Sequence, residues 1–197
     1  MNTQSKTRCE RRERILDAAT QLFQHYGFAK TTVADIAKQA KVGVGSVYLE
    51  FSGKDAIMEA LSNGRYELVL RAMIEAAQSS APFDERVAAV LNARARAFMA
   101  QANGGTHAPD LIQCHCPGTM SAHSRYLDAE KELLVVLLKE GRETGFVRLE
   151  NLEEGARALQ AAYHLTAPPW LFKRQEKETE RLLASLHSVV IYGLVRR

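Results

Sequence analysis

The chain has 197 residues, of which 46% are hydrophobic and 25% are charged, and its formal net charge is +3. This composition is typical of a soluble globular protein with a sizeable core, and it excludes disordered, collagen-like, low-complexity and repeat proteins. The longest apolar run, residues 133–138, is far shorter than the ~18 residues expected of a membrane-spanning helix.

The first 14 residues carry enough positive charge to account for the whole excess. They contain five basic and two acidic side chains, and no apolar stretch follows the charges, so we do not expect a signal peptide. A basic N-terminal arm indicates nucleic acid as a partner, and a solvated, frayed terminus is the alternative interpretation.

Apolar residues recur at intervals of three and four along nearly the whole chain, which predicts an all-α fold. No segment has the pattern of a strand. The nine expected helices cover residues 15–26, 32–40, 45–51, 54–79, 83–102, 111–116, 124–144, 152–166 and 175–195. Pro117-Gly118 is expected to stop the sixth of them.

Two local signals fix the limits of the first helices. Gly27 stands where a left-handed residue ends a helix, and Phe28 follows as the apolar partner of that cap. Thr32 and Asp35 are spaced as a capping box that opens the second helix.

The second and third helices are short and joined by a tight turn, which predicts a helix-turn-helix. The third helix opens with small residues, Gly45 and Ser46, as a helix that enters the major groove of DNA requires. Tyr48 is off the apolar stripe, so its hydroxyl can reach a phosphate oxygen. Lys54 begins the fourth helix, where its charge adds to the positive end of the helix dipole.

These residues form a recognisable pattern. The shared features are I-L-x-A-A-x-x-L-F, Y-G-F, T-T-V-x-D-I-A, V-x-x-G-S-V-Y-x-x-F, and Lys54-Asp55 at the start of the fourth helix. Over about fifty residues the chain resembles the DNA-binding domain of the tetracycline-repressor (TetR) family. The resemblance implies a helix-turn-helix DNA-binding domain over residues 1–52 and a helical ligand-binding and dimerisation domain over residues 53–197.

The resemblance also implies roles for individual residues. Thr32 and Tyr48 are similar to the family's contacts with backbone phosphates, and Lys54 resembles its phosphate contact at the fourth helix. The residues expected to enter or line the groove are Val44, Gly45, Ser46 and Leu49. Val44 could touch a thymine methyl group.

Four positions depart from the family pattern. Lys41 stands where glycine is usual in the turn, which requires an unusual backbone or a different turn. Val44 replaces a common basic residue. Leu49 and Glu50 replace aromatic, histidine or basic residues, and Glu50 could accept a hydrogen bond from cytosine or pair with a basic neighbour.

Aromatic residues and methionines of the second domain predict an apolar pocket for a small-molecule effector, with plain core packing as the alternative. The predicted ligand-binding residues are Tyr66, Met73, Phe98, Gln113, Tyr126 and Tyr163. Because Lys54 and Tyr66 share the fourth helix, we expect this helix to be the only long covalent link between effector and DNA.

Apolar stripes on the last two helices predict a four-helix interface across a two-fold axis. The predicted interface residues are Leu159, Tyr163, Leu182, Leu186, Val189, Val190 and Gly193. The alternative is that these stripes are buried within one subunit.

Three cysteines, an odd number, indicate reduced thiols in a cytoplasmic protein. Cys114, His115 and Cys116 could hold zinc or copper(I), and packing of two small residues beside a surface imidazole is the alternative. We expect no metal and no cofactor.

The sequence therefore predicts a homodimeric transcription factor that binds a palindromic double-stranded DNA operator and responds to a small-molecule effector, with no membrane partner. Release of a repressor by an apolar or amphipathic ligand is the expected mechanism. A response to metal or oxidation through Cys114, His115 and Cys116 is the alternative. A helical enzyme with a vestigial DNA-binding head is a third reading, but the sequence shows no catalytic constellation.

Overall fold

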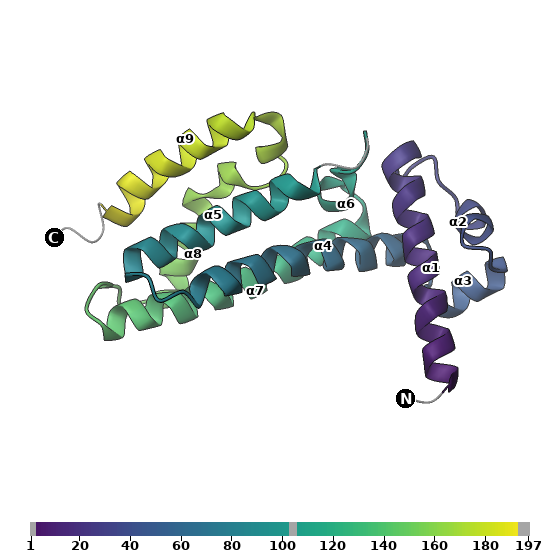
Figure 1. Cartoon of the computed structure of the whole chain (residues 1–197), viewed down its shortest axis with the longest axis horizontal. Coiled ribbons are helices and arrows are strands. Elements are labelled where there is room, and N and C mark those ends of the chain that lie inside the picture. The colour runs from purple at the N-terminus through teal and green to yellow at the C-terminus, as the bar shows by residue number, and fades with distance from the viewer. Residues whose placement is uncertain (1–2, 103–105, 193–197) are drawn as a thin grey trace. The chain divides into compact units, whose positions relative to one another are not determined.

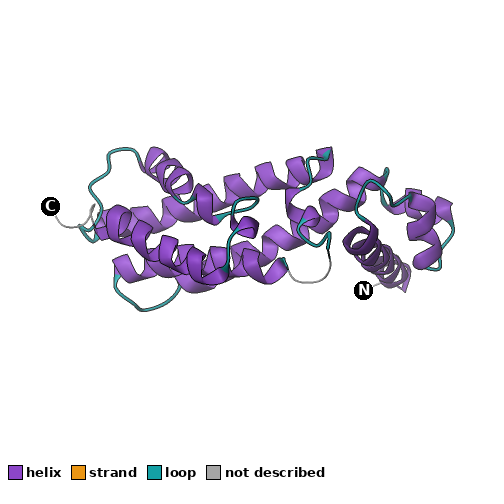
Figure 2. Cartoon of the chain, turned by 90° about the horizontal axis from the view of Figure 1, so that it is seen from above, coloured by secondary structure: helices purple, strands orange, loops and turns teal. Residues whose placement is uncertain are grey.

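The computed structural model describes residues 3–102 and 106–192, and within these ranges it contains nine α-helices (Figure 1). Figure 2 shows no strand in the described part of the chain, which confirms the predicted all-α fold. The helices are α1 (Thr3–Tyr26), α2 (Val33–Gln39), α3 (Val44–Glu50), α4 (Lys54–Ala77), α5 (Phe83–Gln101), α6 (Asp110–Gln113), α7 (Pro117–Glu143), α8 (Leu152–Ala162) and α9 (Glu176–Leu186). None of these described helices has the length and apolar character needed to cross a membrane.

The chain forms two compact units. The first contains residues 1–65 and 102–123, and the second contains residues 66–101 and 124–197. The expected boundary after residue 52 marks the end of the helix-turn-helix. The first unit extends beyond it to include the start of α4, all of α6 and the start of α7.

The first unit is built around one apolar core. Its fully buried members come from five helices, and include Ile15 and Phe23 of α1, Ile36 of α2, Val47 of α3, Ile57 of α4 and Leu111 of α6. Because α3 is only seven residues long, it depends on this core for its helical structure.

The end of α1 confirms the predicted cap. Gly27 has a φ of 81°, and its amide donates to the carbonyl of Phe23 at 2.9 Å. The rings of Phe23 and Phe28 lie 5.4 Å apart, so the apolar residue after the cap packs back onto the helix.

The start of α7 corrects one expectation. Pro117 was expected to stop a helix, but it is the first residue of a 27-residue helix. Proline is favourable at the first helical position because it has no amide hydrogen to leave unpaired there. Helix α7 therefore begins seven residues before the expected Ser124, and α6 is shortened to four residues.

Two long helices, α4 and α7, each contain residues of both units. The expectation that the fourth helix is the only long covalent link is therefore wrong. Both helices connect the two units along the chain.

The second unit contains α5, α8 and α9 with the later parts of α4 and α7. The helix expected over residues 152–166 ends at Ala162, and the short helices η1 (His164–Thr166) and η2 (Leu171–Lys173) follow. The last expected helix is α9, which continues as the π-helical segment η3 (His187–Tyr192). At this change the buried His187 ring bonds to the hydroxyl of Tyr163 at 2.8 Å and to Asn92 at 3.0 Å.

Candidate functional site

The start of α2 is fixed by the predicted capping box. The Thr32 hydroxyl accepts the Asp35 amide at 3.1 Å, and the Asp35 carboxylate accepts the Thr32 amide at 3.0 Å. The Thr32 hydroxyl also donates to Asp35 at 2.6 Å. These hydrogen bonds from Thr32 lower the pKa of the Asp35 carboxyl. A contact between the Thr32 hydroxyl and DNA, which stays a prediction, would compete with this bond.

The turn between α2 and α3 has the unusual backbone that Lys41 requires. Lys41 has a φ of 55°, a left-handed conformation, and the next amide, of Val42, donates to the Ala37 carbonyl at 3.0 Å. A side chain makes this conformation unfavourable, which explains why glycine suits the position.

Replacing Lys41 with glycine is therefore expected to raise the free energy of unfolding by up to ~1 kcal/mol, because the left-handed strain is larger than the added entropy of the unfolded chain. Chemical denaturation of the full chain measures the change. Lys41→Ala is the control, since it removes the same charge but keeps a β-carbon. Equal stability of the two variants would contradict the assignment of strain to this turn.

Helix α3 presents an apolar face to solvent. Val44, Tyr48 and Leu49 are exposed by 43%, 54% and 73%, while Val47 is fully buried. A β-carbon on Gly45 would meet nothing within 4 Å, so its own chain does not require glycine there. Ser46 is half-buried. Among the predicted DNA-binding residues, Val44, Gly45, Tyr48 and Leu49 thus share an open surface on one short helix.

Glu50, at the end of α3, pairs with arginines of α1. Its carboxylate accepts Arg8 Nε at 3.2 Å and Arg11 Nε at 3.0 Å, and its side chain is only 1% exposed. Of the two roles left open for Glu50, the structure shows the pairing with a basic neighbour. The hydrogen bond from Arg11 is the main cause that lowers the pKa of the Glu50 carboxyl, and Arg8 adds to it.

The basic N-terminal segment is helical from Thr3 rather than an extended arm. The guanidinium of Arg12 lies 4.3 Å from the centre of the Phe51 ring and donates to the Glu50 carbonyl at 3.5 Å. The arginine side chains and the end of α3 therefore form one charged cluster, which spacing along the sequence could not have located.

Lys54 ties the start of α4 to the loop after α1. Its ammonium donates to the carbonyls of Phe28 at 2.8 Å and Thr31 at 3.0 Å, and it lies 4.3 Å from the centre of the Phe28 ring. An ammonium has three N–H groups. These two bonds leave one for the phosphate contact that the sequence predicts.

Comparison with known proteins identifies this domain. Residues 15–61 match the model of the bacterial regulatory proteins of the tetR family. The chain is 47% identical over 49 residues to the HTH-type transcriptional regulator HbdR of Aromatoleum sp. (strain CIB), an alignment of 25% of this chain and 21% of that protein. Residues 15–61 therefore carry a DNA-binding domain like that of the tetR-family regulators. Over 78 residues it is 33% identical to the uncharacterized HTH-type transcriptional regulator YhgD of Bacillus subtilis, covering 40% of this chain and 41% of YhgD. The chain thus spans less than half the length of these curated relatives.

Solved structures extend the likeness in fold to nearly the whole chain. The fatty acid degradation regulator FadR from Bacillus halodurans superposes with a TM-score of 0.73 at 21% identity, over 94% of this chain and 97% of that one. FadR from Bacillus subtilis, solved in complex with stearoyl-CoA, superposes with a TM-score of 0.69 at 21% identity, over 92% of this chain and 98% of that one. At this identity the likeness shows that the second unit has the helical fold of TetR-family regulators.

Four of the predicted effector-binding residues pack together in the second unit. The rings of Tyr66 and Tyr126 are stacked at 4.7 Å, and Phe98 meets them edge-on at 6.1 and 5.6 Å. The Tyr126 hydroxyl donates to the sulfur of Met73 at 3.9 Å. All four side chains are buried, and burial raises the pKa of both tyrosines. This packing is the core alternative that the sequence left open.

The other two predicted effector residues lie elsewhere. Tyr163 is fully buried in the second unit, against His187. Gln113 is half-buried on α6 and belongs to the first unit. The structure therefore does not bring the six residues together around one space.

An apolar cavity of about 340 Å³ lies in the second unit instead, and the six predicted residues do not line it. Its wall comes from α5, the end of α7, the segment before α8, α8 itself and η3, and includes Phe83, Val87, Leu138, Phe146, Arg148, Leu149, Leu159, Val190 and Ile191. The rings of Phe83 and Phe146 stack with their centres 5.8 Å apart. Phe83 is the first residue of α5, and Phe146 lies in the segment that follows α7. A search for apolar periodicity within helices overlooks aromatic residues at such positions.

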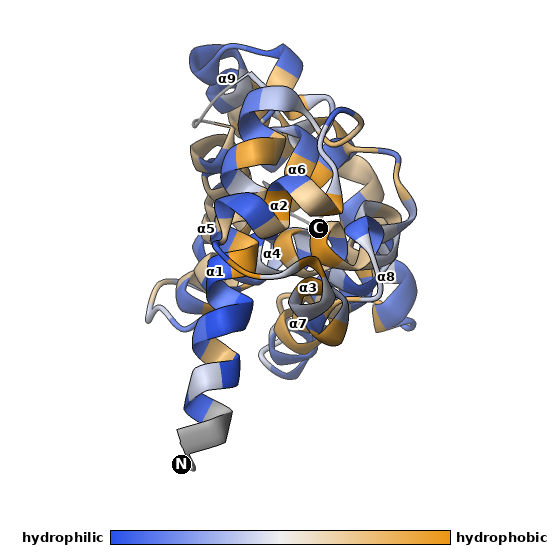
Figure 3. Ribbon diagram, turned by 90° about the vertical axis from the view of Figure 1, so that its right-hand side faces the viewer, coloured by the Kyte–Doolittle hydropathy of each residue, from blue (hydrophilic) through white to orange (hydrophobic). Residues whose placement is uncertain are grey.

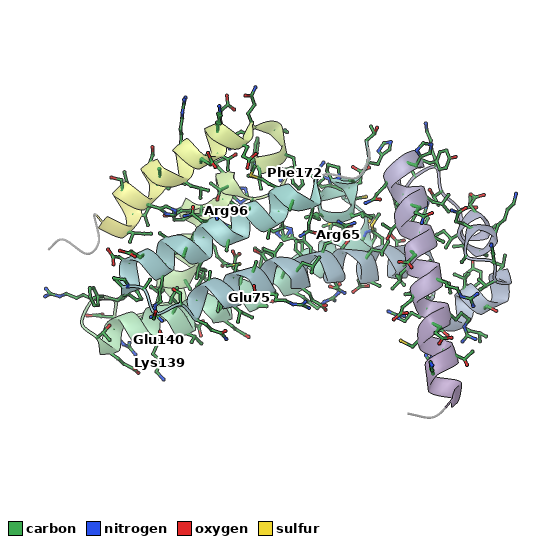
Figure 4. The ribbon with its side chains drawn as sticks, in the orientation of Figure 1. Arg65, Glu75, Arg96, Lys139, Glu140 and Phe172 are labelled. Atoms are coloured by element: carbon green, nitrogen blue, oxygen red, sulfur yellow. The ribbon has the colours of Figure 1, made fainter. Side chains whose placement is uncertain are left out.

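A second cavity, of about 220 Å³, lies between α5 and α9 and is more polar. Arg96 of α5, labelled in Figure 4, lines it together with Asn92 and His187. Burial lowers the pKa of the His187 imidazole. The neutral ring can then bond to Tyr163 and Asn92 without a buried charge.

The predicted dimer residues differ in exposure. Val189 is 74% exposed, while Leu182, Leu186 and Val190 are half-buried. Leu159 is buried, and Tyr163 is fully buried within its own unit, as the alternative interpretation of these stripes requires. Gly193 lies outside the described residues. Leu159 and Val190 also line the apolar cavity, so the two predicted roles meet on the same side chains.

The cysteine segment has the features of packed thiols. Cys116 is buried with its sulfur 3.3 Å from the Thr119 hydroxyl, and His115 is exposed. Burial and the hydrogen bond with Cys116 raise the pKa of the Cys114 thiol to about 11. At neutral pH this thiol is protonated, whereas metals and oxidants react with the thiolate. In residues 3–102 and 106–192, no three His, Cys, Asp or Glu side chains are grouped to hold a metal ion.

Proposed function

We propose that this chain is a homodimeric transcriptional repressor that binds a palindromic operator through α3 and is released by a small molecule held in the second unit. The observation that carries the proposal is the exposed apolar face of α3, with Val44, Tyr48 and Leu49 in solvent, in a domain that matches the tetR family. A short helix with small and apolar side chains outward fits the major groove, where it can contact thymine methyl groups.

The proposed effector is an apolar or amphipathic molecule. The cavity of about 340 Å³ in the second unit supports this class, because its wall is almost entirely apolar, with Arg148 as its charged residue. The Bacillus subtilis FadR, a neighbour in fold, is solved with stearoyl-CoA, which has a long apolar chain. A fatty acyl compound is therefore the first class to test.

The proposed switch uses the two helices that run through both units. A ligand shifts the equilibrium only by its difference in affinity for the DNA-binding and released states. The coupling free energy between two such sites is usually roughly 1–3 kcal/mol. Because the coupling is reciprocal, operator DNA must weaken effector binding by the same factor by which the effector weakens operator binding. The proposed role is regulation rather than catalysis, which the names of the relatives support. The DNA partner implies that the regulator works in the cytoplasm.

The test begins with the full-length protein and a random-sequence duplex library. Enrichment of a palindromic sequence is expected, with half-sites about one helical turn (~34–36 Å) or a multiple apart. Failure of the chain to enrich any duplex would overturn the proposed DNA-binding function.

Loss of the two expected phosphate contacts should weaken binding to every duplex. Tyr48→Phe removes one hydrogen bond, worth about 1 kcal/mol or fivefold in affinity per protomer. Lys54→Ala should also reduce the slope of log affinity against log salt by ~1 for each protomer. Lys139→Ala is the charge-matched control, because Lys139 is exposed on α7 in the second unit (Figure 4). Equal salt slopes for the Lys54 and Lys139 variants would remove Lys54 from the interface.

A further inference from the structure

The first turns of α1 lie outside the core of their unit. The helix begins at Thr3, and its side chains are described from residue 6 onward. Residues 6–14 are exposed or half-buried, and Ile15 is the first buried side chain among those described. Figure 3 shows the coloured part of these turns as mostly hydrophilic. A helical segment without core contacts frays unless something else holds it.

Glu50 supplies that hold. Its carboxylate bonds to Arg8 and Arg11, which are one helical turn apart, and Arg12 packs on the ring of the next residue, Phe51. These contacts join residues 38–42 positions apart in the chain. With its side chain 1% exposed and both oxygens bonded, Glu50 cannot also accept a hydrogen bond from a base in this arrangement.

Helix α3 carries no basic side chain of its own, so the pairing of Glu50 with the arginines of α1 affects which cations lie near bound DNA. Its seven residues include no lysine, arginine or histidine, and Glu50 is anionic. Cations that neutralise phosphates beside α3 must therefore come from other elements. Arg8 donates to Glu50 through Nε while its side chain remains 69% exposed, so the rest of its guanidinium fork faces solvent next to the end of α3.

We propose that Glu50 is a positioning residue for DNA binding, which holds Arg8 and Arg11 beside α3 so that their guanidinium groups meet the phosphates flanking the groove. This inference rests on the proposed DNA-binding function. It assigns Arg8 and Arg11 of α1 and the apolar face of α3 to one surface. It also explains how an acidic residue is tolerated at this position of a DNA-reading helix.

The test compares two isosteric variants of the full-length chain, Glu50→Gln and Glu10→Gln. Both remove one negative charge, but Glu10 is exposed on the outer part of α1. The probes are the duplex enriched by the unsubstituted chain and a scrambled duplex of equal composition. Glu50→Gln should weaken the three charge-assisted hydrogen bonds that order Arg8 and Arg11. Because ordered phosphate contacts fix the register in which α3 meets the selected sequence, the ratio of selected to scrambled affinity should fall by about tenfold. Glu10→Gln should leave the ratio unchanged.

A double-mutant cycle tests whether Glu50 acts on DNA binding through Arg8 and Arg11 or only stabilises the fold. Arg8→Gln with Arg11→Gln should lower the ratio similarly, and adding Glu50→Gln to that background should cost nothing more. In the dimer of the Arg8→Gln, Arg11→Gln variant, the slope of log affinity against log salt should fall by up to ~4, because each protomer loses contacts with two phosphates. The exposed Arg8→Gln variant alone covers the case in which Glu50→Gln does not fold.

An unchanged affinity ratio in folded Glu50→Gln would overturn the inference alone, and so would losses that add across the cycle. If Glu50→Gln lowers the thermal stability but leaves the slope of log affinity against log salt unchanged, Glu50 only stabilises the domain. Failure of the unsubstituted chain to enrich any duplex would instead overturn the proposed function, and is seen before any variant is made.

Discussion

Replacing Gly118 with alanine is expected to destabilise the first unit by about 3 kcal/mol, because it overpacks a contact between two backbones. A β-carbon at Gly118 would lie 2.2 Å from the carbonyl oxygen of Asp55 and 2.9 Å from the amide nitrogen of Glu59. Both atoms belong to the backbone of α4, so no side-chain rotation can relieve the clash. Helices α4 and α7 would have to separate. Chemical denaturation monitored by circular dichroism measures the loss.

Gly64→Ala is the matched control for this prediction. Gly64 is also a helical glycine, on α4, but a β-carbon there would meet nothing within 4 Å. Alanine should stabilise it by ~0.5–1 kcal/mol, since glycine loses more chain entropy on folding. The free energy of unfolding should fall for Gly118→Ala and rise for Gly64→Ala. Destabilisation of both variants to the same extent would rule out the close approach at Gly118.

Hydrogen bonds add to the contact at Gly118. Nearby, the Ser62 hydroxyl donates to the Leu111 carbonyl at 2.7 Å, and Ser121 donates to Glu59 at 2.9 Å. These bonds fix α6 and the start of α7 to the helix that Lys54 begins. The start of α7 is therefore joined to α4 by a packed junction rather than a loop.

Features fixed by neighbouring residues were accessible from the sequence. The Gly27 cap and the Thr32–Asp35 capping box each depend on a few consecutive positions, and the structure shows both. For Lys41 the sequence left an unusual backbone or a different turn open, and the structure shows the unusual backbone. The exposed face of α3 belongs to this class too, because a seven-residue helix with one buried stripe leaves its other side open.

Features made by distant segments were not accessible in the same way. The sequence alone could not choose between a DNA base and a basic residue as the partner of Glu50, because Arg8 and Arg11 precede it by about forty positions. Pro117 was misassigned because a helix start and a helix stop share the same residue type. The apolar cavity was missed because aromatic residues in a core and aromatic residues around a space have the same periodicity.

A buried ion pair in the second unit gives a large expected effect. Arg94 of α5 and Glu130 of α7 are 3% and 0% exposed, and Arg94 Nε lies 2.7 Å from Glu130 Oε1, without the alignment of a hydrogen bond. Arg94 also donates to the Tyr163 carbonyl at 3.3 Å, and Gln160 donates to the other Glu130 oxygen at 3.1 Å. Glu130→Gln is expected to cost 3–5 kcal/mol, on the order of the penalty for one uncompensated buried charge.

The paired substitution Arg94→Met with Glu130→Leu separates the two possible reasons for that loss. If the cost of Glu130→Gln comes from leaving Arg94 charged and unpartnered, removing both charges should restore stability to within ~1 kcal/mol of the original chain, since apolar residues of similar volume replace a pair that is costly to desolvate. Denaturation midpoints of the two variants provide the measurement. A double variant as unstable as Glu130→Gln would mean that the polar bonds of Arg94 and Glu130 to Tyr163 and Gln160, rather than charge balance, hold α5, α7 and α8 together.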